Sequence, residues 1–371
     1  MIYLDYAANT PADPEILRFF CEKEASLIGN GNAAHRAGRE TAALLEETAA
    51  NAAELLGCAP GEILFTSGAT EGNNLALKGM TADVLGGQII LSPLEHASVR
   101  EPAEYLKKRG FTVAYLSLNR DGTVDLDHLA ELLKRETALV AVAAVDSELG
   151  VVQPVAEIAA LVKERSEARF HVDATQAAGK VPLAPERIDT MTFSAHKIYG
   201  LNGSGMLYRN RRAALSPLFH GGHGAFRAGT PTAALNAAFV MALNKAQTER
   251  ESRFKEVKEK NAALRAALSR YDKVSLNSPD SAVPHILNLG VEGVRGTVMR
   301  QALDGEGVCV SVRSACGSDG EPSAAVTALG GSRREALSSW RISLSHLTGE
   351  EEIASFAAAF DRCYRRLTAK A

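Results

Sequence analysis

Residues 138–173, ALVAVAAVDSELGVVQPVAEIAALVKERSEARFHVD, contain the pattern that decides the fold. The run from Ala138 to Val145 is apolar throughout and has the length of a buried strand. Pro154 then begins an amphipathic segment that extends to about Ser166, and a second short strand is predicted from Phe170 to Asp173. A helix that connects two such strands predicts a crossover between parallel neighbours.

The same alternation extends outward from about residue 60 to residue 210. The other strands of this region are predicted at 63–66, 88–91, 111–116, 191–194 and 205–208, and its other helices from residue 70 onward, at 101–109 and at 125–135. This pattern predicts an α/β fold, with a large domain whose mostly parallel seven-stranded sheet is covered by helices on both faces.

The pattern changes near residue 240, where a smaller α+β domain is expected. We expect a long charged helix over 244–271 as a solvated connector, strands at 284–289, 308–312 and 339–344, a helix near 297–303 and a closing helix over 350–367. The large domain should then comprise residues 15–250, and the small domain residues 1–14 and 251–371.

The composition excludes several classes of function. The chain has 371 residues, of which 46% are hydrophobic and 23% charged, and its formal net charge is −3. This length allows two domains around a cleft, and no global positive charge predicts nucleic acid or an anionic membrane as a partner. No apolar stretch approaches the roughly 20 residues that span a bilayer, and the first residues lack the pattern of a signal peptide. We therefore expect a cytoplasmic protein.

The cysteines show no spacing typical of disulfides or metal sites. Their number is odd and no CxxC or Cys/His cluster occurs, which argues against a disulfide framework and against a zinc site. Without further context, each cysteine is expected to be a small buried side chain. The five cysteines are Cys21, Cys58, Cys309, Cys316 and Cys363.

Two predicted strand ends carry residues suited to binding an anion and a cationic ring. The stretch 65–74, FTSGATEGNN, passes from a strand through small residues into a helix, whose free N–H groups and Thr70 hydroxyl can bind a phosphate. Asp173 follows another strand at the edge where open α/β sheets bind ligands, and its carboxylate can keep a pyridine nitrogen protonated. The alternatives are an ordinary turn for the first stretch and a helix N-cap for Asp173.

A lysine follows a third predicted strand. Lys197 lies 24 residues beyond Asp173, between His196 and the short stretch ending at Gly200, and is placed to form a Schiff base in a partly desolvated pocket. A lone lysine is ordinarily a solvated surface charge. The order of phosphate turn, aspartate and lysine, each at a strand end, favours the functional interpretation.

Ten short motifs occur in order along the chain. They are YLDYAA (3–8), the segment from Gly31-Asn32 through His35 to Gly38-Arg39, TSGATE (66–71), EH (95–96), HVDATQ (171–176), SAHK (194–197), RAGT (227–230), PHILN (284–288), SAC (314–316) and SSWR (338–341). Together they resemble the cysteine desulfurases of the class V aminotransferase type over nearly the whole chain. The resemblance implies the fold of type I pyridoxal-phosphate transferases and a homodimer.

The resemblance implies pyridoxal 5'-phosphate as cofactor and a role for each matching residue. Lys197 would hold the cofactor and later move the Cα proton, Asp173 would pair with the pyridine nitrogen, and Gln176 would donate to the phenolate oxygen. His96 would stack on the ring and serve in acid–base catalysis. The residues expected at the phosphate are Ala69, Thr70, Ser194, His196 and, from a second subunit, Thr230.

The resemblance also implies how a substrate would bind and react. Arg341 would bind the substrate carboxylate with its guanidinium fork, and Asn32 would be a second contact. Cys316, in a Ser/Gly/Asp-rich stretch typical of a mobile loop, would be the nucleophile. Positive charge from Arg313 or His96 would favour its reactive thiolate form.

The expected reaction takes sulfur from L-cysteine, gives L-alanine and leaves a persulfide on Cys316 for an acceptor protein in iron–sulfur cluster assembly or thiolation. Two alternatives remain: a selenocysteine lyase or other pyridoxal-phosphate lyase or aminotransferase, and a cofactor-bearing scaffold of low activity. The chain departs from the family pattern at Ser147, where an asparagine normally contacts the phenolate oxygen, at Arg313, where a glycine is usual, and over 221–227, which is about two residues short.

Overall fold

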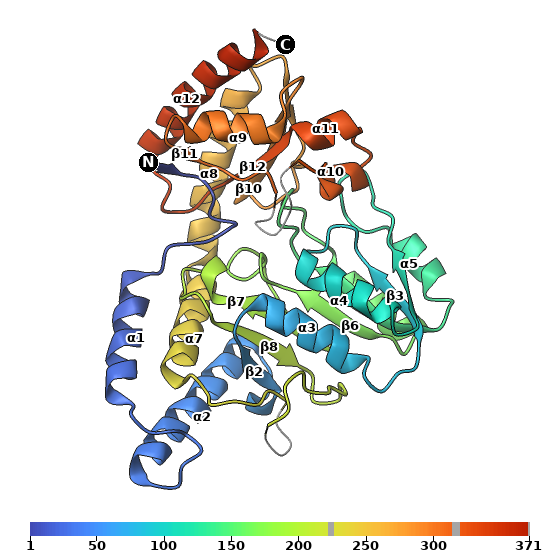
Figure 1. The fold of residues 1–371 in the computed structure, drawn as a ribbon, viewed down its shortest axis with the longest axis vertical. Helices are drawn as coiled ribbons and strands as arrows, with labels where there is room; N and C mark the ends of the chain where they lie inside the picture. Colours follow the sequence, from blue (N-terminus) through green and yellow to red (C-terminus); the bar gives the residue numbers. More distant parts are fainter. Residues whose placement is uncertain (222–225, 314–319, 370–371) are drawn as a thin grey trace.

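The computed structural model describes residues 1–221, 226–313 and 320–369, and its largest element is a seven-stranded sheet (Figure 1). From one edge to the other its strands are β2 (Ile63–Thr66), β8 (Gly205–Arg209), β7 (Thr190–Ser194), β6 (Arg169–Asp173), β5 (Thr137–Ala143), β3 (Gly87–Leu91) and β4 (Phe111–Tyr115). Only β8 runs antiparallel to its neighbours, and the other pairs are parallel. The predicted α/β fold with a mostly parallel seven-stranded sheet is confirmed.

Strand β5 shows why this sheet is covered on both faces. Leu139 and Ala141 pack into one hydrophobic cluster, whereas Val140 and Val142 pack into another. Successive side chains of a strand point to opposite faces, so a strand that is apolar at every position must be buried on both sides. All four side chains are buried completely.

Helices form the two outer layers. The cluster with Leu139 contains side chains from α3 (Ala69–Met80) and α4 (Ala97–Lys107). The cluster with Val140 contains side chains from α5 (Leu126–Leu132), α6 (Val155–Arg165) and α7 (Ala233–Thr248). Two further helices, α1 (Pro14–Ser26) and α2 (Arg36–Leu56), pack against α7. A short 3-10 helix, η1 (Pro60–Glu62), precedes β2.

The second unit stands above the sheet in Figure 1 and contains both the N-terminal strand and the C-terminal helix. Its antiparallel sheet has the order β12 (Ser339–Ser343), β10 (Ile286–Val291) and β9 (Val274–Leu276), and β1 (Ile2–Tyr3) pairs in parallel with β11 (Val308–Cys309). Its helices are α8 (Arg250–Leu268), α9 (Gly296–Asp304), α10 (Ala324–Ala328), α11 (Arg333–Ser338) and α12 (Glu350–Thr368).

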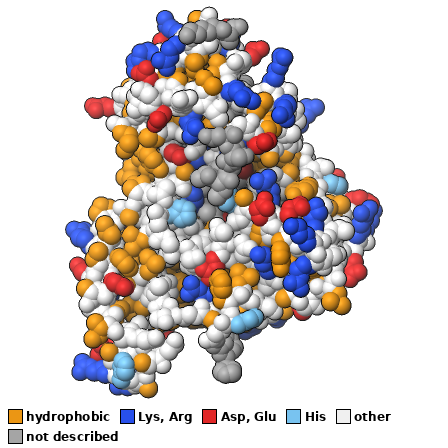
Figure 2. All heavy atoms as spheres, viewed as in Figure 1, with side chains coloured by type: hydrophobic (Ala, Val, Ile, Leu, Met, Phe, Trp, Pro, Cys, Tyr) orange, Lys and Arg blue, Asp and Glu red, His pale blue; other side chains and the backbone are white. Residues whose placement is uncertain are grey.

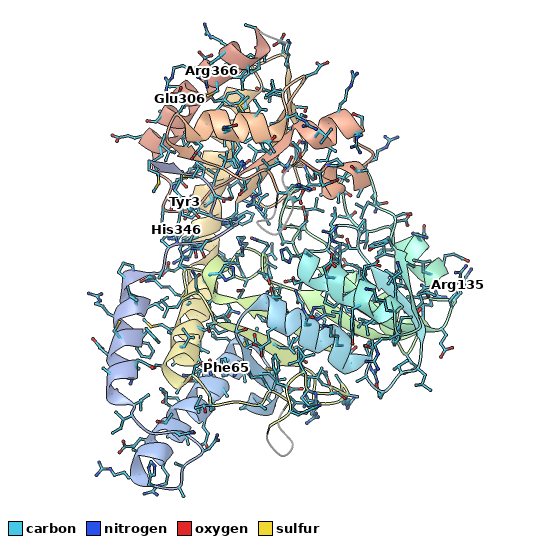
Figure 3. The ribbon with its side chains drawn as sticks, viewed as in Figure 1. Tyr3, Phe65, Arg135, Glu306, His346 and Arg366 are labelled. Carbon is cyan, nitrogen blue, oxygen red and sulfur yellow. The ribbon has the colours of Figure 1, made fainter. Side chains whose placement is uncertain are left out.

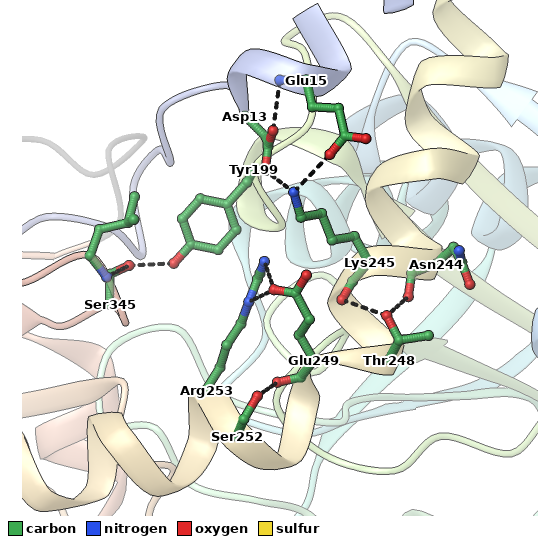
Figure 4. Close-up of polar contacts among 11 residues, drawn as sticks. Asp13, Glu15, Tyr199, Asn244, Lys245, Thr248, Glu249, Ser252, Arg253 and Ser345 are labelled. Atoms are coloured by element: carbon green, nitrogen blue, oxygen red, sulfur yellow. Dashed lines mark hydrogen bonds and ion pairs between the residues drawn. The ribbon is translucent and has the colours of Figure 1, made fainter.

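The charged helix predicted over 244–271 is divided in the structure. The helical pattern breaks at Glu249, so α7 belongs to the large unit and α8 leads to the small one. Side-chain contacts hold this joint: Arg253 pairs with Glu249, and the Tyr199 hydroxyl lies 2.5 Å from the Ser345 hydroxyl (Figure 4). The prediction of a solvated connector was wrong in part, because α8 buries Val257, Leu264 and Leu268 in the core of the small unit.

Within residues 1–221, 226–313 and 320–369, none of the helices combines the length and the apolarity that crossing a bilayer requires.

The small unit has an aromatic core that can be tested by mutation. Phe360 is 0% exposed, and its ring lies 5.1 Å from that of Tyr271 and 6.0 Å from that of Trp340. Because a large buried ring leaves a cavity when it is removed, we expect Phe360→Ala to lower the free energy of unfolding by about 3–5 kcal/mol. Urea denaturation followed by the fluorescence of Trp340, the one tryptophan of the chain, measures this loss.

Leu347→Ala is the control, because Leu347 belongs to the same unit but its side chain is 51% exposed. Its substitution should change the free energy of unfolding by less than about 0.5 kcal/mol. Equal losses in the two variants would contradict the packing described here.

Candidate active site

A pocket of about 420 Å³ opens at the carboxyl ends of the large sheet, below the small unit. Nine of the residues predicted for the site line it: Ala69, Thr70, His96, Ser147, Asp173, Gln176, His196, Lys197 and Arg341. The first eight lie at or just after the ends of β2, β3, β5, β6 and β7, which meet at one edge of the sheet, and Arg341 comes from β12. Figure 2 shows histidine side chains at the waist between the two units.

The N-terminus of α3 forms one end of this pocket. Gly68 is its N-cap, and the first N–H groups of a helix have no acceptor within it, so they can bind an anion. A Cβ atom at Gly205 would lie 2.6 Å from the Gly68 Cα atom, which explains why the start of β8 needs a glycine beside this turn. Ser194 does not line the pocket. Its hydroxyl lies 2.9 Å from Nδ1 of His196, and His196 does line the pocket.

Glu71 is an acidic group at the same helix start, and an ion pair with Arg227 balances its negative charge. Its carboxylate accepts the Ser67 N–H at 2.7 Å and pairs with Arg227 at 3.0 Å. Burial raises the pKa of Glu71, but the hydrogen bonds from Ser67 and Arg227 outweigh burial and lower it overall. The helix start therefore remains able to accept an anion.

Asp173 is held by a buried polar network. Its two carboxylate oxygens accept the Thr175 N–H at 2.9 Å and the Asn73 amide at 2.8 Å. Because a carboxylate only accepts, the Asn73 nitrogen must face Asp173, and the Asn73 oxygen then faces His171 Nε2 at 3.0 Å. His171 consequently carries a proton on Nε2. Burial lowers the pKa of His171, which favours the neutral form of its ring.

The same network fixes His96. The Asn73 amide also donates to the Ser98 hydroxyl at 2.8 Å, and that hydroxyl lies 2.8 Å from His96 Nδ1. The Ser98 N–H donates to the same Nδ1 at 3.1 Å, so a neutral His96 ring carries its proton on Nε2. Burial lowers the pKa of His96, which favours this neutral form.

Lys197 lies in η2 (Ala195–Lys197), directly after β7. Its Nζ donates to the carbonyl oxygens of Ala7 and Ala8 at 2.8 and 2.6 Å. The Gln176 amide donates to the same Ala7 oxygen at 2.8 Å. The N-terminal segment therefore supplies acceptors for the lysine (the Tyr3 side chain of this segment is labelled in Figure 3). The Lys197 charge in turn acts on His196: burial and this charge lower the pKa of His196 to about 4.

Arg341 reaches the pocket from the small unit. Its side chain is 1% exposed, and it donates to the Ser147 carbonyl oxygen at 2.7 Å and to Asp5 at 2.8 Å. Its Nε atom has no hydrogen-bond partner among the described residues. A buried guanidinium with N–H groups to spare is suited to bind a carboxylate.

Two further predicted residues are described by the structure but do not line this pocket. Asn32 and Thr230 are exposed and lie outside its lining. Cys316 lies in 314–319, outside the described residues. Sequence reasoning missed Asp5, Asn73 and Ser98, although Asp5 and Asn73 occur in stretches that it had singled out.

Two carboxyl groups are buried behind the pocket. Glu95 accepts the Ala143 N–H at 2.6 Å with one oxygen, and its other oxygen has no partner among the described residues. Asp146 accepts the N–H groups of Glu148 and Leu149. Burial raises the pKa of Glu95 well above its ordinary value and that of Asp146 to about 7.

Comparisons with known proteins agree with this geometry. The family model described as Aminotransferase class-V matches residues 2–356. Cysteine desulfurase IscS of Dictyoglomus turgidum is 34% identical over 375 residues, which cover 99% of this chain and 95% of that protein. A solved NifS-like protein is 31% identical with a TM-score of 0.91 over 99% of both chains. A structure described as SspA in complex with cysteine is 30% identical with a TM-score of 0.82, over 93% of this chain and 99% of that one.

Asp146→Asn tests the buried carboxyl group. The pKa of Asp146 rises from 3.8 to about 7 on burial, so the folded state binds the proton more tightly than the unfolded state. The wild-type protein therefore loses stability at this residue as pH rises from about 4 to 7. The asparagine cannot ionise, and we expect the variant to gain at least about 1 kcal/mol relative to wild type over this range. Urea denaturation at pH 4.5 and pH 8 measures the gain.

Asp127→Asn, at an exposed position of α5, is the control and should show no such gain. Parallel pH profiles of wild type and Asp146→Asn would refute the assignment.

Proposed function

The chain belongs to the aminotransferase class-V family, within its cysteine desulfurases, and we propose that it uses pyridoxal 5'-phosphate to move sulfur from L-cysteine to Cys316. One observation supports this above all: Lys197, Asp173 and Arg341 line a single pocket, although Arg341 comes from a different unit. This combination provides an amine for a carbonyl compound, an anion for a ring nitrogen and a cation for a substrate carboxylate.

The residues of the pocket fit the proposed cofactor. A phosphate suits the α3 N-terminus, and a protonated pyridine nitrogen suits the Asp173 carboxylate, which has lone pairs left beyond its two hydrogen bonds. The residues that we propose to hold it are Lys197, Asp173, Gln176, His96, Ser147, Ala69, Thr70, Ser194 and His196. When bound, its ring withdraws electrons from the substrate Cα atom, a chemistry that the side chains do not supply.

Lys197 would act twice. Its amine would hold the cofactor, and its Nζ would also carry the proton that leaves the substrate Cα atom. The carbonyl oxygens of Ala7 and Ala8, which accept Nζ at 2.8 and 2.6 Å, hold this amine at the pocket. His96, as a neutral ring with its proton on Nε2, is a hydrogen-bond donor at the pocket.

Arg341 would orient the substrate through its carboxylate. Its buried guanidinium is fixed by acceptors from both units, Ser147 and Asp5. Because it is already ordered, it loses less conformational entropy on substrate binding than a surface arginine would. We also propose Asn32 as a second carboxylate contact.

Cys316 would receive the sulfur. Its thiolate forms an S–S bond with the substrate sulfur while the C–S bond of the substrate breaks, and the electron pair of that bond stays with carbon, which is protonated to give alanine. The persulfide would pass to an acceptor protein. We further propose a homodimer, because Thr230 is exposed and lies outside the pocket of its own chain, where it is available to a second subunit.

The wild-type protein incubated with L-cysteine and a reductant should release alanine and sulfide in a 1:1 ratio. Cys316→Ala should lose sulfide release while it keeps the visible absorbance of the bound cofactor, because the variant lacks only the sulfur nucleophile. Amino-acid analysis and a colorimetric sulfide assay measure the two products.

Cys309→Ala is the matched control, because Cys309 is also a cysteine and lies in β11, outside the pocket. It should keep wild-type activity. The proposal would be wrong if the wild type formed pyruvate or no product, or if Cys316→Ala released sulfide at the wild-type rate.

A further inference from the structure

Asp5 contacts Arg341 without belonging to the pocket. One Asp5 oxygen accepts from Arg341 Nη2 at 2.8 Å, and Arg341 lines the pocket whereas Asp5 does not. The arginine is 1% exposed and the Asp5 side chain is 17% exposed. Asp5 therefore supports the guanidinium from outside the cavity in which a substrate would lie.

Asp5 is itself held on its other side. Its second oxygen accepts the Ser311 hydroxyl at 2.7 Å, so the carboxylate binds Arg341 through one oxygen only. The backbone of Ser311 is bonded to that of Arg341, and Asp5 forms a bridge with Ser343 of β12. Two separate segments, β12 and the one that contains Ser311, thus fix the position of this carboxylate, and two hydrogen bonds restrict its rotation.

The contacts of Arg341 leave part of its guanidinium for a ligand. The group has five N–H bonds. The Ser147 carbonyl oxygen and Asp5 take one each, on different nitrogens, and Nε has no partner among the described residues. Because the guanidinium is planar, fixing both of its terminal nitrogens fixes the direction of the remaining N–H groups as well.

We propose that Asp5 is a positioning residue that sets the direction of the Arg341 guanidinium and thereby lets the site select ligands that carry a carboxylate. The inference rests on the proposed function, because it assigns to Arg341 the substrate carboxylate. Asp5 acts through its hydrogen bond to Nη2. An asparagine can keep this bond with its amide oxygen, whereas an alanine cannot.

The test compares two ligands that carry no sulfur and differ only at the carboxylate. L-alanine carries it, and L-alaninamide has the same amine and methyl group with a neutral amide. The change in visible absorbance of the cofactor-loaded protein gives a Kd for each ligand, and the ratio of the alaninamide Kd to the alanine Kd measures selection for the carboxylate. We expect Asp5→Ala to lower this ratio about tenfold and Asp5→Asn to keep it within about threefold of wild type.

Asp13→Ala is the matched control. Asp13 is also 17% exposed, and it pairs at 2.7 Å with Lys245, which, unlike Arg341, does not line the pocket (Figure 4). This variant loses a comparable ion pair and should keep the wild-type ratio. If Asp5→Ala does not fold, Asp5→Ser replaces it, because its short side chain cannot reach Nη2.

Each outcome decides one claim. An unchanged ratio in Asp5→Ala, or an equal fall in Asp5→Asn, would overturn the role of the Asp5 hydrogen bond. Equal loss of affinity for both ligands would indicate general distortion and would also overturn it. A wild type that binds alanine and alaninamide equally would instead refute the proposed role of Arg341, on which the inference depends.

Discussion

The arrangement of the pocket depends on how the first ten residues bind both units at once. Ile2 and Tyr3 pair with β11 of the small unit, and the Ala7 N–H donates to the Ser343 hydroxyl of β12 at 2.9 Å. The carbonyl oxygens of the same Ala7 and of Ala8 accept a hydrogen bond each from Lys197 Nζ of the large unit. This segment therefore fixes where the small unit stands above the sheet, and the position of Arg341 relative to Lys197 follows from it.

Buried polar groups near the pocket are costly unless they are paired, and one side chain, Asn73, pairs three of them. Asn73 donates to Asp173 and Ser98 and accepts from His171, so it satisfies three groups that come from different elements. For function, this network determines which atoms at the pocket carry protons. The Asp173 carboxylate presents only acceptor oxygens, and a neutral His96 ring must carry its proton on Nε2.

The fold was predictable because its signals are local: an apolar run such as Ala138 to Val145 marks a buried strand from its own residues. Residues at strand ends, such as Asp173 and Lys197, were found for the same reason. The contacts of Asn73 and Asp5 were not, since Asn73 meets Ser98 across 25 residues and Asp5 meets Arg341 across 336. The break at Glu249 was missed because the charged helical pattern continues through it. The predictions for Asn32 and Thr230 remain open, because both residues lie outside the pocket of a single chain.

The most direct measurement is to locate the cofactor on the chain. Lys180 is a rival to Lys197, because it donates to Gln176 at 3.1 Å and burial, with the nearby Lys197 charge, lowers its pKa to about 7. Borohydride reduction of the cofactor-loaded protein, followed by mass spectrometry of its peptides, identifies the modified lysine. We expect one phosphopyridoxyl group, on Lys197. A group on Lys180, or none on either lysine, would contradict this account.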